Sequence, residues 1–139
     1  VVAAGDCTVL PHPLTGEGRV RLESVNSAVS QATAAAATLV GVPDRAPNVP
    51  WFWSNQGDLR LQIAGLSTGY DDFVVRGEPD SEKFAVLYYR AGRLLAVDAV
   101  NSPPDYMVVR KALTQGATIP ADRAADEATP LKQLLMAAA

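Results

Sequence analysis

The sequence contains one cysteine and one histidine among its 139 residues. A single thiol, Cys7, cannot form an intramolecular disulfide, and Cys7 with His12 falls short of the ligand set that zinc requires. No metal site is therefore predicted. A chain with so little cysteine is expected in a reducing compartment, and the cytoplasm is the default localisation.

Runs of basic residues and long apolar runs are also missing. The formal charge is −3 and the isoelectric point is near 5.0, so the field of the chain does not attract nucleic acid or an anionic membrane. The longest weakly polar stretch, residues 32–42, is too short to span a bilayer. We expect no nucleic-acid partner and no membrane partner.

Sequence motifs for phosphate binding and nucleophilic catalysis are lacking as well. No P-loop, no GxSxG and no GxGxxG occurs in the chain. Asp71 and Asp72 are adjacent, but neighbouring residues of a strand point to opposite faces, so we interpret this pair as a solvated turn rather than a hydrolytic dyad. No catalytic residue is predicted from this chain.

The first part of the chain predicts a strand, a loop and a helix. Residues 1–6 form a small apolar run typical of a strand buried on both faces. Residues 24–40 are rich in alanine and predict a helix, which Gly41 would end in the left-handed conformation. Residues 42–50 contain three prolines and predict a stiff connector between two structural units.

The second part predicts an antiparallel sheet followed by helices. Ser102 and Gly116 mark the start and end of one helix, and Thr129-Pro130 starts another. The predicted fold class is α+β, with an antiparallel β-sheet of about four to five strands and C-terminal helices. The strands are expected to form a meander because short turns join them. Their ranges are 59–64, 73–75, 84–88 and 94–100.

Three places in the sequence are candidates for ligand binding, and each has a structural alternative. Asp6 follows a strand end, where an acid accepts a hydrogen bond from a sugar or ribityl hydroxyl or closes a turn. Glu23, Ser24 and Val25 stand at a helix start, whose free N–H groups bind an electron-rich ligand edge or are capped by Ser24.

The third candidate is the aromatic segment of residues 51–53, which contains both tryptophans, Trp51 and Trp53. Each indole offers a large apolar area, so the segment either anchors a strand to a core or faces a bound aromatic ligand.

Five segments, AAGDC, RLESVNSAVSQA, PWFWSNQ, LQIAGLSTGYD and AVDAVNSPPDYMVVRKAL, together resemble a known family in their order and spacing. They are similar to the C-terminal part of the FAD-dependent ferredoxin reductases of bacterial oxygenase systems, which include putidaredoxin, rubredoxin and biphenyl-dioxygenase ferredoxin reductases. The resemblance implies that residues 1–45 are the tail of the FAD-binding domain, a strand-loop-helix remnant of an α/β domain. Residues 50–139 would form the reductase C-terminal domain.

The resemblance also implies residue roles. Asp6 matches the aspartate that binds the ribityl chain of FAD, and Val25, with Glu23 and Ser24 beside it, matches the helix start at the isoalloxazine ring. Trp53 matches the tryptophan next to the flavin, and Trp51 its neighbour near the partner-binding surface.

The function implied for the full-length protein is that of an oxidoreductase in electron transfer. Electrons would pass from NADH, bound by a domain outside these residues, through FAD to a 2Fe-2S ferredoxin or a rubredoxin. The isolated chain is expected to be inactive. The alternative is a non-catalytic interaction module that docks a ferredoxin or a second copy of itself, and self-association as a homo-oligomer is a further expectation.

Overall fold

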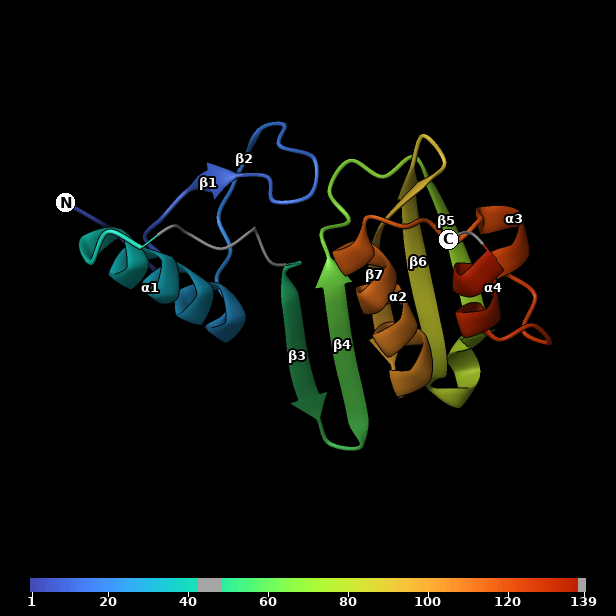
Figure 1. Ribbon diagram of the computed structural model, residues 1–139. Helices are drawn as coiled ribbons and strands as arrows, with labels where there is room; N and C mark the ends of the chain where they lie inside the picture. Colours follow the sequence, from blue (N-terminus) through green and yellow to red (C-terminus); the bar gives the residue numbers. More distant parts are fainter. Residues whose placement is uncertain (43–48, 138–139) are drawn as a thin grey trace. The chain divides into compact units, whose positions relative to one another are not determined.

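The structure is a computed structural model that describes residues 1–42 and 49–137 (Figure 1). Its contacts group the chain into two compact units, Val1–Phe52 and Trp53–Ala139. The central residues of the predicted connector, 43–48, lie outside the described residues. No helix in the described ranges is long and apolar enough to cross a membrane.

The first unit contains a small hairpin and one long helix. Strands β1 (Leu10–Pro11) and β2 (Arg19–Val20) pair antiparallel, and α1 (Val25–Leu39) follows. The predicted helix is confirmed. At its start, the Ser24 Oγ accepts the N–H of Ser27 at 3.1 Å. Gly41 ends it with a φ of 71°, and the N–H groups of Gly41 and Val42 close back on the last turn.

The strand predicted at residues 1–6 is wrong. Residues 1–4 have no regular structure, and Val1 and Val2 are exposed. A strand buried on both faces needs a neighbour on each side, but β1 and β2 are only two residues long and pair with each other. His12, expected in a surface loop, is 7% exposed, and its Nδ1 accepts the N–H groups of Leu14 and Thr15.

The second unit is built on the predicted antiparallel sheet, which has five strands in the order β3-β4-β7-β6-β5. The meander is confirmed for β5, β6 and β7 but wrong for β4, which pairs with β7 rather than β5. Strand β7 takes a central place because it is the most buried strand, whereas β5 with its exposed side chains lies at an edge. The strands are β3 (Trp51–Gln56), β4 (Leu59–Gly65), β5 (Asp72–Glu78), β6 (Lys83–Arg90) and β7 (Arg93–Val100).

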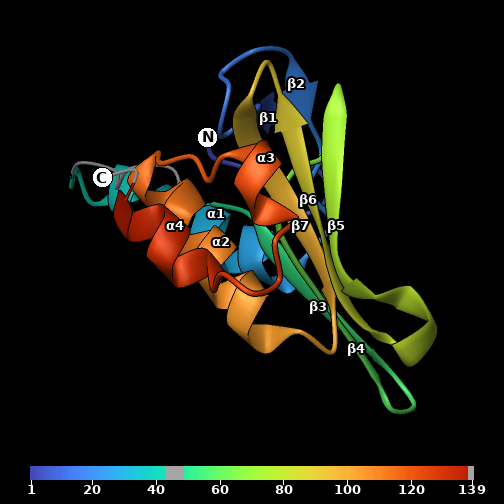
Figure 2. The same cartoon turned by 90° about the vertical axis from the view of Figure 1, so that its right-hand side faces the viewer.

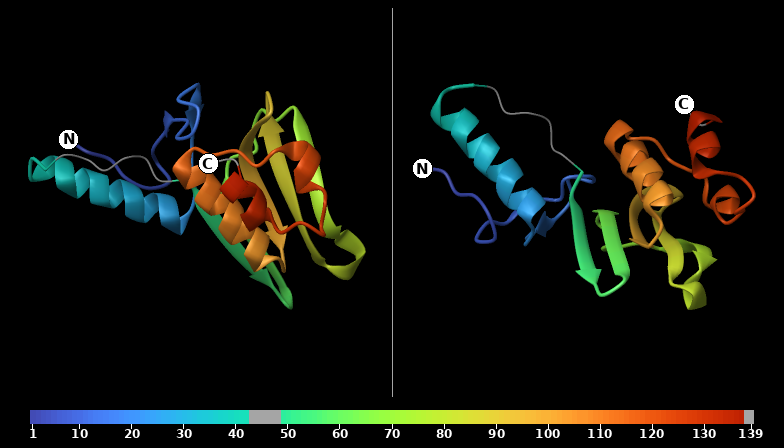
Figure 3. Two further views of the ribbon diagram at one scale, coloured as in Figure 1. Left: turned by 45° about the vertical axis from the view of Figure 1, so that its right-hand side comes forward. Right: turned by 90° about the horizontal axis from the view of Figure 1, so that it is seen from below.

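Helices cover one face of this sheet (Figure 2). The helix α2 packs against β4 and β7, and α4 packs against α2 (Figure 3). Both helices begin at the predicted residues, although the Ser102 side chain makes no capping hydrogen bond to the backbone of α2. The sequence prediction missed α3 and the short 3-10 turn η1. The elements are η1 (Pro79–Ser81), α2 (Pro103–Gln115), α3 (Ala121–Ala124) and α4 (Leu131–Ala137).

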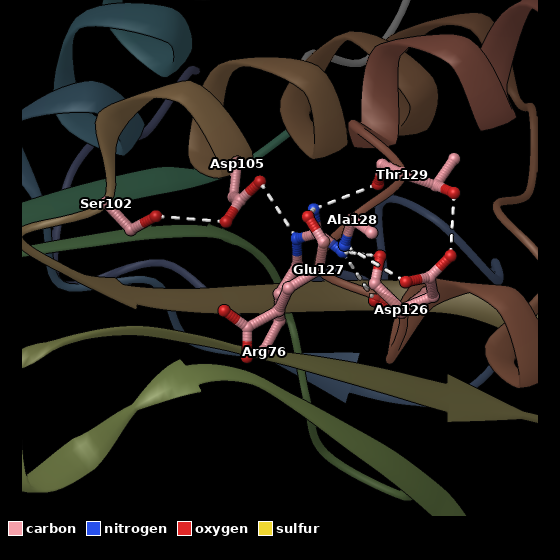
Figure 4. Close-up of polar contacts among 8 residues, drawn as sticks. Arg76, Ser102, Asp105, Asp126, Glu127, Ala128 and Thr129 are labelled. Carbon is pink, nitrogen blue, oxygen red and sulfur yellow. Dashed lines mark hydrogen bonds and ion pairs between the residues drawn. The ribbon is translucent and has the colours of Figure 1, made fainter.

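Arg76 fastens the loop between α3 and α4 to the covered side of the sheet (Figure 4). Its side chain is buried, and its Nε lies 3.4 Å from the Oδ1 of Asp105 at the start of α2. Asp105 in turn accepts the hydroxyl hydrogen bond of Ser102 at 3.0 Å. The guanidinium also donates to four backbone carbonyl groups, those of Ala124, Asp126, Glu127 and Thr129.

Candidate functional site at the start of helix α1

The start of α1 presents free hydrogen-bond donors next to the residues singled out in the sequence. The backbone N–H groups of Val25 and Asn26 lie in the first turn and have no acceptor within the helix. Val25 is 64% exposed, Glu23 is exposed and Ser24 is half-buried. Because the dipole of a 15-residue helix places partial positive charge at this end, the turn suits an electron-rich ligand edge.

Asp6 lies in a turn that is tied to the same helix. The amide oxygen of Gln31, in the middle of α1, accepts the backbone N–H of Gly5 at 2.9 Å and the hydroxyl of Thr8 at 2.5 Å. The Gln31 amide nitrogen donates to Ser27 at 2.8 Å, which fixes the rotamer of the glutamine. Asp6 itself is exposed at the tip of this turn, so its carboxylate can accept hydrogen bonds from a ligand.

The sequence prediction missed Gln31 and Thr8. A glutamine within an alanine-rich helix carries no local signal, because its partners lie 23 and 26 residues away in the chain.

An open groove of about 520 Å³ lies between the N-terminal segment and α1. Small and apolar side chains dominate its walls, and neither Asp6 nor the residues at the start of α1 line it. The predicted site residues of the first unit therefore lie on α1 or in a turn bonded to it, but they do not line this groove. The lining residues are Val2, Ala3, Cys7, Thr8, Val9, Leu10, Gln31, Ala34, Ala35 and Thr38.

Within the first unit, a hydrogen bond joins Trp51 to the start of α1. The backbone N–H of Trp51 donates to the Oδ1 of Asn26 at 3.4 Å, and both residues belong to the first unit. Trp51 is half-buried, whereas Phe52 is 41% exposed and Trp53 is 42% exposed. Burial in a core therefore explains the presence of Trp51 better than that of Trp53. The indole of Trp53 is more exposed, so a ligand or a partner can contact it.

Within residues 1–42 and 49–137, no group of three or more histidine, cysteine, aspartate or glutamate side chains is arranged to hold a metal ion. Cys7 is exposed, and its Sγ lies 3.6 Å from the carbonyl oxygen of Ala4.

Comparison with known proteins shows which family the second unit belongs to. A family described as reductase C-terminal matches residues 51–135. The 5,5'-dehydrodivanillate O-demethylase ferredoxin reductase subunit of Sphingobium sp. is 44% identical over 99% of this chain, which covers 33% of that protein. Rhodocoxin reductase of Rhodococcus erythropolis is 45% identical over 95% of this chain and 31% of its own length.

Solved structures agree with the sequence matches. The reductase in the covalent putidaredoxin reductase-putidaredoxin complex superposes with a TM-score of 0.91 and 38% identity over 97% of this chain and 32% of that chain. The predicted resemblance and the α+β fold class are confirmed by these matches. The chain spans about a third of the length of the relatives it matches.

Proposed function

Because this chain belongs to the reductase C-terminal family, we propose that it is the C-terminal part of a flavoprotein ferredoxin reductase of an oxygenase system. The full-length protein passes electrons from NADH or NADPH through FAD to a 2Fe-2S ferredoxin or a rubredoxin. The single observation that carries the proposal is similarity to ferredoxin reductases over almost the whole chain, in both sequence and backbone.

The two units take different parts in this proposal. Residues 1–45 are the end of the FAD-binding domain, and residues 50–139 are the C-terminal domain. The first unit fits a flavin in two respects: the free N–H groups at the start of α1 match an electron-rich ring edge, and the exposed carboxylate of Asp6 matches a polyol chain.

The chain's own residues bind and orient the cofactor. Asp6 would accept a hydrogen bond from the ribityl chain, and the turn at Glu23, Ser24 and Val25 would offer backbone donors to the ring. Trp53 would provide an apolar contact for the flavin, and Trp51 would contribute to the surface that meets the ferredoxin. The bound FAD would supply the redox chemistry, so no side chain here needs to act as an acid or a base.

A visible absorption spectrum of the purified 139-residue chain, set beside that of the full-length reductase, is the first experiment. We expect a flavin band in the full-length protein and none in the chain alone, which lacks most of the FAD-binding domain. Light scattering on the same sample measures self-association. A full-length protein that binds no flavin, or that does not reduce a ferredoxin with NADH or NADPH, would overturn the proposal.

Two tryptophan variants of the full-length reductase separate the residue roles. Trp53→Ala is expected to change the flavin spectrum or the rate of ferredoxin reduction. Trp51→Ala is expected to leave the spectrum unchanged and to raise the KM for the ferredoxin. An unchanged spectrum with unchanged turnover in Trp53→Ala would show that this indole does not border the flavin.

A further inference from the structure

Asp6 stands at the tip of a tight turn that runs from Gly5 to Thr8. The backbone N–H of Thr8 donates to the carbonyl oxygen of Gly5 at 3.0 Å. Asp6 and Cys7 are therefore the two central residues of a β-turn. Gly5 has a φ of 92°, a left-handed value that glycine adopts without steric cost. Because the Asp6 side chain is exposed, the position of its carboxylate depends on how this turn is held.

The amide oxygen of Gln31 holds both ends of the turn. It accepts the N–H of Gly5 at one end and the hydroxyl of Thr8 at the other, at 2.9 and 2.5 Å. The Thr8 hydroxyl also lies 2.8 Å from the carbonyl oxygen of Gly5, but it has only one hydrogen, and that carbonyl already accepts the backbone N–H of Thr8. The hydroxyl hydrogen is therefore available to Gln31.

The orientation of the Gln31 amide is fixed by the chemistry of its partners. The backbone N–H of Gly5 is a donor only, so the amide oxygen rather than the nitrogen must face it. The amide nitrogen then points to the hydroxyl of Ser27, one helical turn earlier in α1, and donates to it at 2.8 Å. Ser27 is only 6% exposed, so this contact lies inside the unit. The helix thus holds the glutamine, and the glutamine holds the turn.

This arrangement joins two of the predicted flavin-binding elements to one rigid element. The helix α1 carries free N–H groups in its first turn at Val25, and it carries Gln31 six residues later, about 9 Å along the helix axis. Because an α-helix keeps that spacing, the Asp6 turn and the helix start are held in a fixed relation before a ligand arrives. A site that is preorganised in this way loses less conformational freedom on binding, which raises its affinity.

We propose that Gln31 is a positioning residue for FAD binding, which sets the place of the Asp6 carboxylate through the turn without touching the cofactor. The inference rests on the proposed function, in which Asp6 accepts a hydrogen bond from the ribityl chain. The effect of Gln31 on FAD affinity is therefore transmitted through Asp6.

Fluorescence titration of the apo form of the full-length reductase with FAD measures this effect as a Kd. Gln31→Met keeps the length and the helix propensity of the side chain but removes every hydrogen bond of the amide. We expect it to raise the Kd for FAD at least about fivefold, because both bonds to the turn are lost. Thr33→Ala, at an exposed position on the same helix, is the matched control and should change the Kd by less than about twofold.

The conservative variant Gln31→Glu should bind FAD more tightly than Gln31→Met. A carboxylate accepts the same two bonds from the turn, and the hydroxyl of Ser27 can donate to it instead of accepting. A Kd for Gln31→Glu as high as that of Gln31→Met would contradict the role of the acceptor oxygen.

A double-mutant cycle with Asp6→Ala separates positioning from general damage to the helix. Once Asp6 is replaced, Gln31→Met should change the Kd for FAD by less than about twofold. Additive losses in the double variant would overturn the proposal, and so would an unchanged Kd in Gln31→Met when Asp6→Ala weakens binding. An unchanged Kd in Asp6→Ala would contradict the proposed role of Asp6 together with this inference. A native reductase that binds no FAD would contradict the proposed function itself.

Discussion

Replacement of Arg76 is expected to be among the most damaging single changes in the second unit. The side chain is 8% exposed and Asp105, its ion-pair partner, is 19% exposed. Arg76→Met keeps an unbranched apolar side chain of comparable length but removes every donor. The carbonyl groups that the guanidinium now satisfies would then lose their partner, with the shortest bond, to Asp126, measuring 2.6 Å.

The expected loss in the free energy of unfolding follows from two energy ranges. Hydrogen bonds from a charged donor contribute about 1.5–3 kcal/mol each, but bonds to one group are not additive. Removing one member of a buried ion pair costs about 3–5 kcal/mol, because the other charge stays without compensation. We therefore expect Arg76→Met to lower the free energy of unfolding by about 3–5 kcal/mol. Arg76→Lys should lose less, about 1–3 kcal/mol, because an ammonium group keeps a charge and some donors but not the planar fork.

Urea denaturation of the 139-residue chain, followed by far-ultraviolet circular dichroism, measures these losses. Hydrogen exchange of the loop between α3 and α4 reports whether the damage is local. Arg60→Met, at an exposed position on β4, is the matched control and should change stability by less than about 0.5 kcal/mol. If Arg76→Met unfolded within about 1 kcal/mol of the native chain with an unchanged m-value, the assignment of Arg76 as the clamp of this loop would be refuted.

Three further changes test other features of the second unit. Tyr89→Phe should raise the free energy of unfolding by up to about 1 kcal/mol in urea denaturation, because the Tyr89 hydroxyl is buried and has no hydrogen-bond partner among the described residues; a loss would reveal a missed partner. Gly77→Ala should cost about 2–4 kcal/mol in the same assay, since Gly77 has a φ of 91° and an added Cβ would lie 2.5 Å from the carbonyl oxygen of Lys83; a neutral effect would contradict this crowding. Burial raises the pKa of Asp98, so its contribution to stability is present below pH 3.8 and is lost as the pH rises through the folded pKa. Asp98→Asn should therefore stabilise the 139-residue chain at neutral pH but not below pH 3.8, and denaturation curves with the same difference at both pH values would refute this linkage.

Local signals predicted most of the elements. Ser24 and Gly41 mark the ends of α1 through hydrogen bonds that span a few residues, and Gly116 ends α2 in the same way. Ser102 starts α2 without a side-chain capping bond. Such bonds depend only on neighbours in the chain, so the sequence contains all the information they need. The strand expected at residues 1–6 failed for the opposite reason, since a strand exists only through partners elsewhere.

The candidate site was predictable only in part. Glu23, Ser24 and Val25 were placed correctly at a helix start because capping is local. Asp6 lies in a turn after Gly5, but the strand that was expected to end there is absent. The attachment of that turn to α1 through Gln31 was not predictable, because it joins segments 23 to 26 residues apart. The roles of these residues toward FAD stay predictions.

The sequence by itself determined the α+β class, the periodicity of the strands and the helix ends, because these depend on local hydrogen bonds and on the alternation of apolar residues. Only the tertiary structure decided that β7 lies between β4 and β6, that Arg76 gathers distant carbonyl groups, and that Gln31 joins the Asp6 turn to α1. Strand order and cross-strand neighbours follow from which surfaces can be buried together. That choice depends on the whole chain at once, since each strand competes with every other for the same places in the sheet.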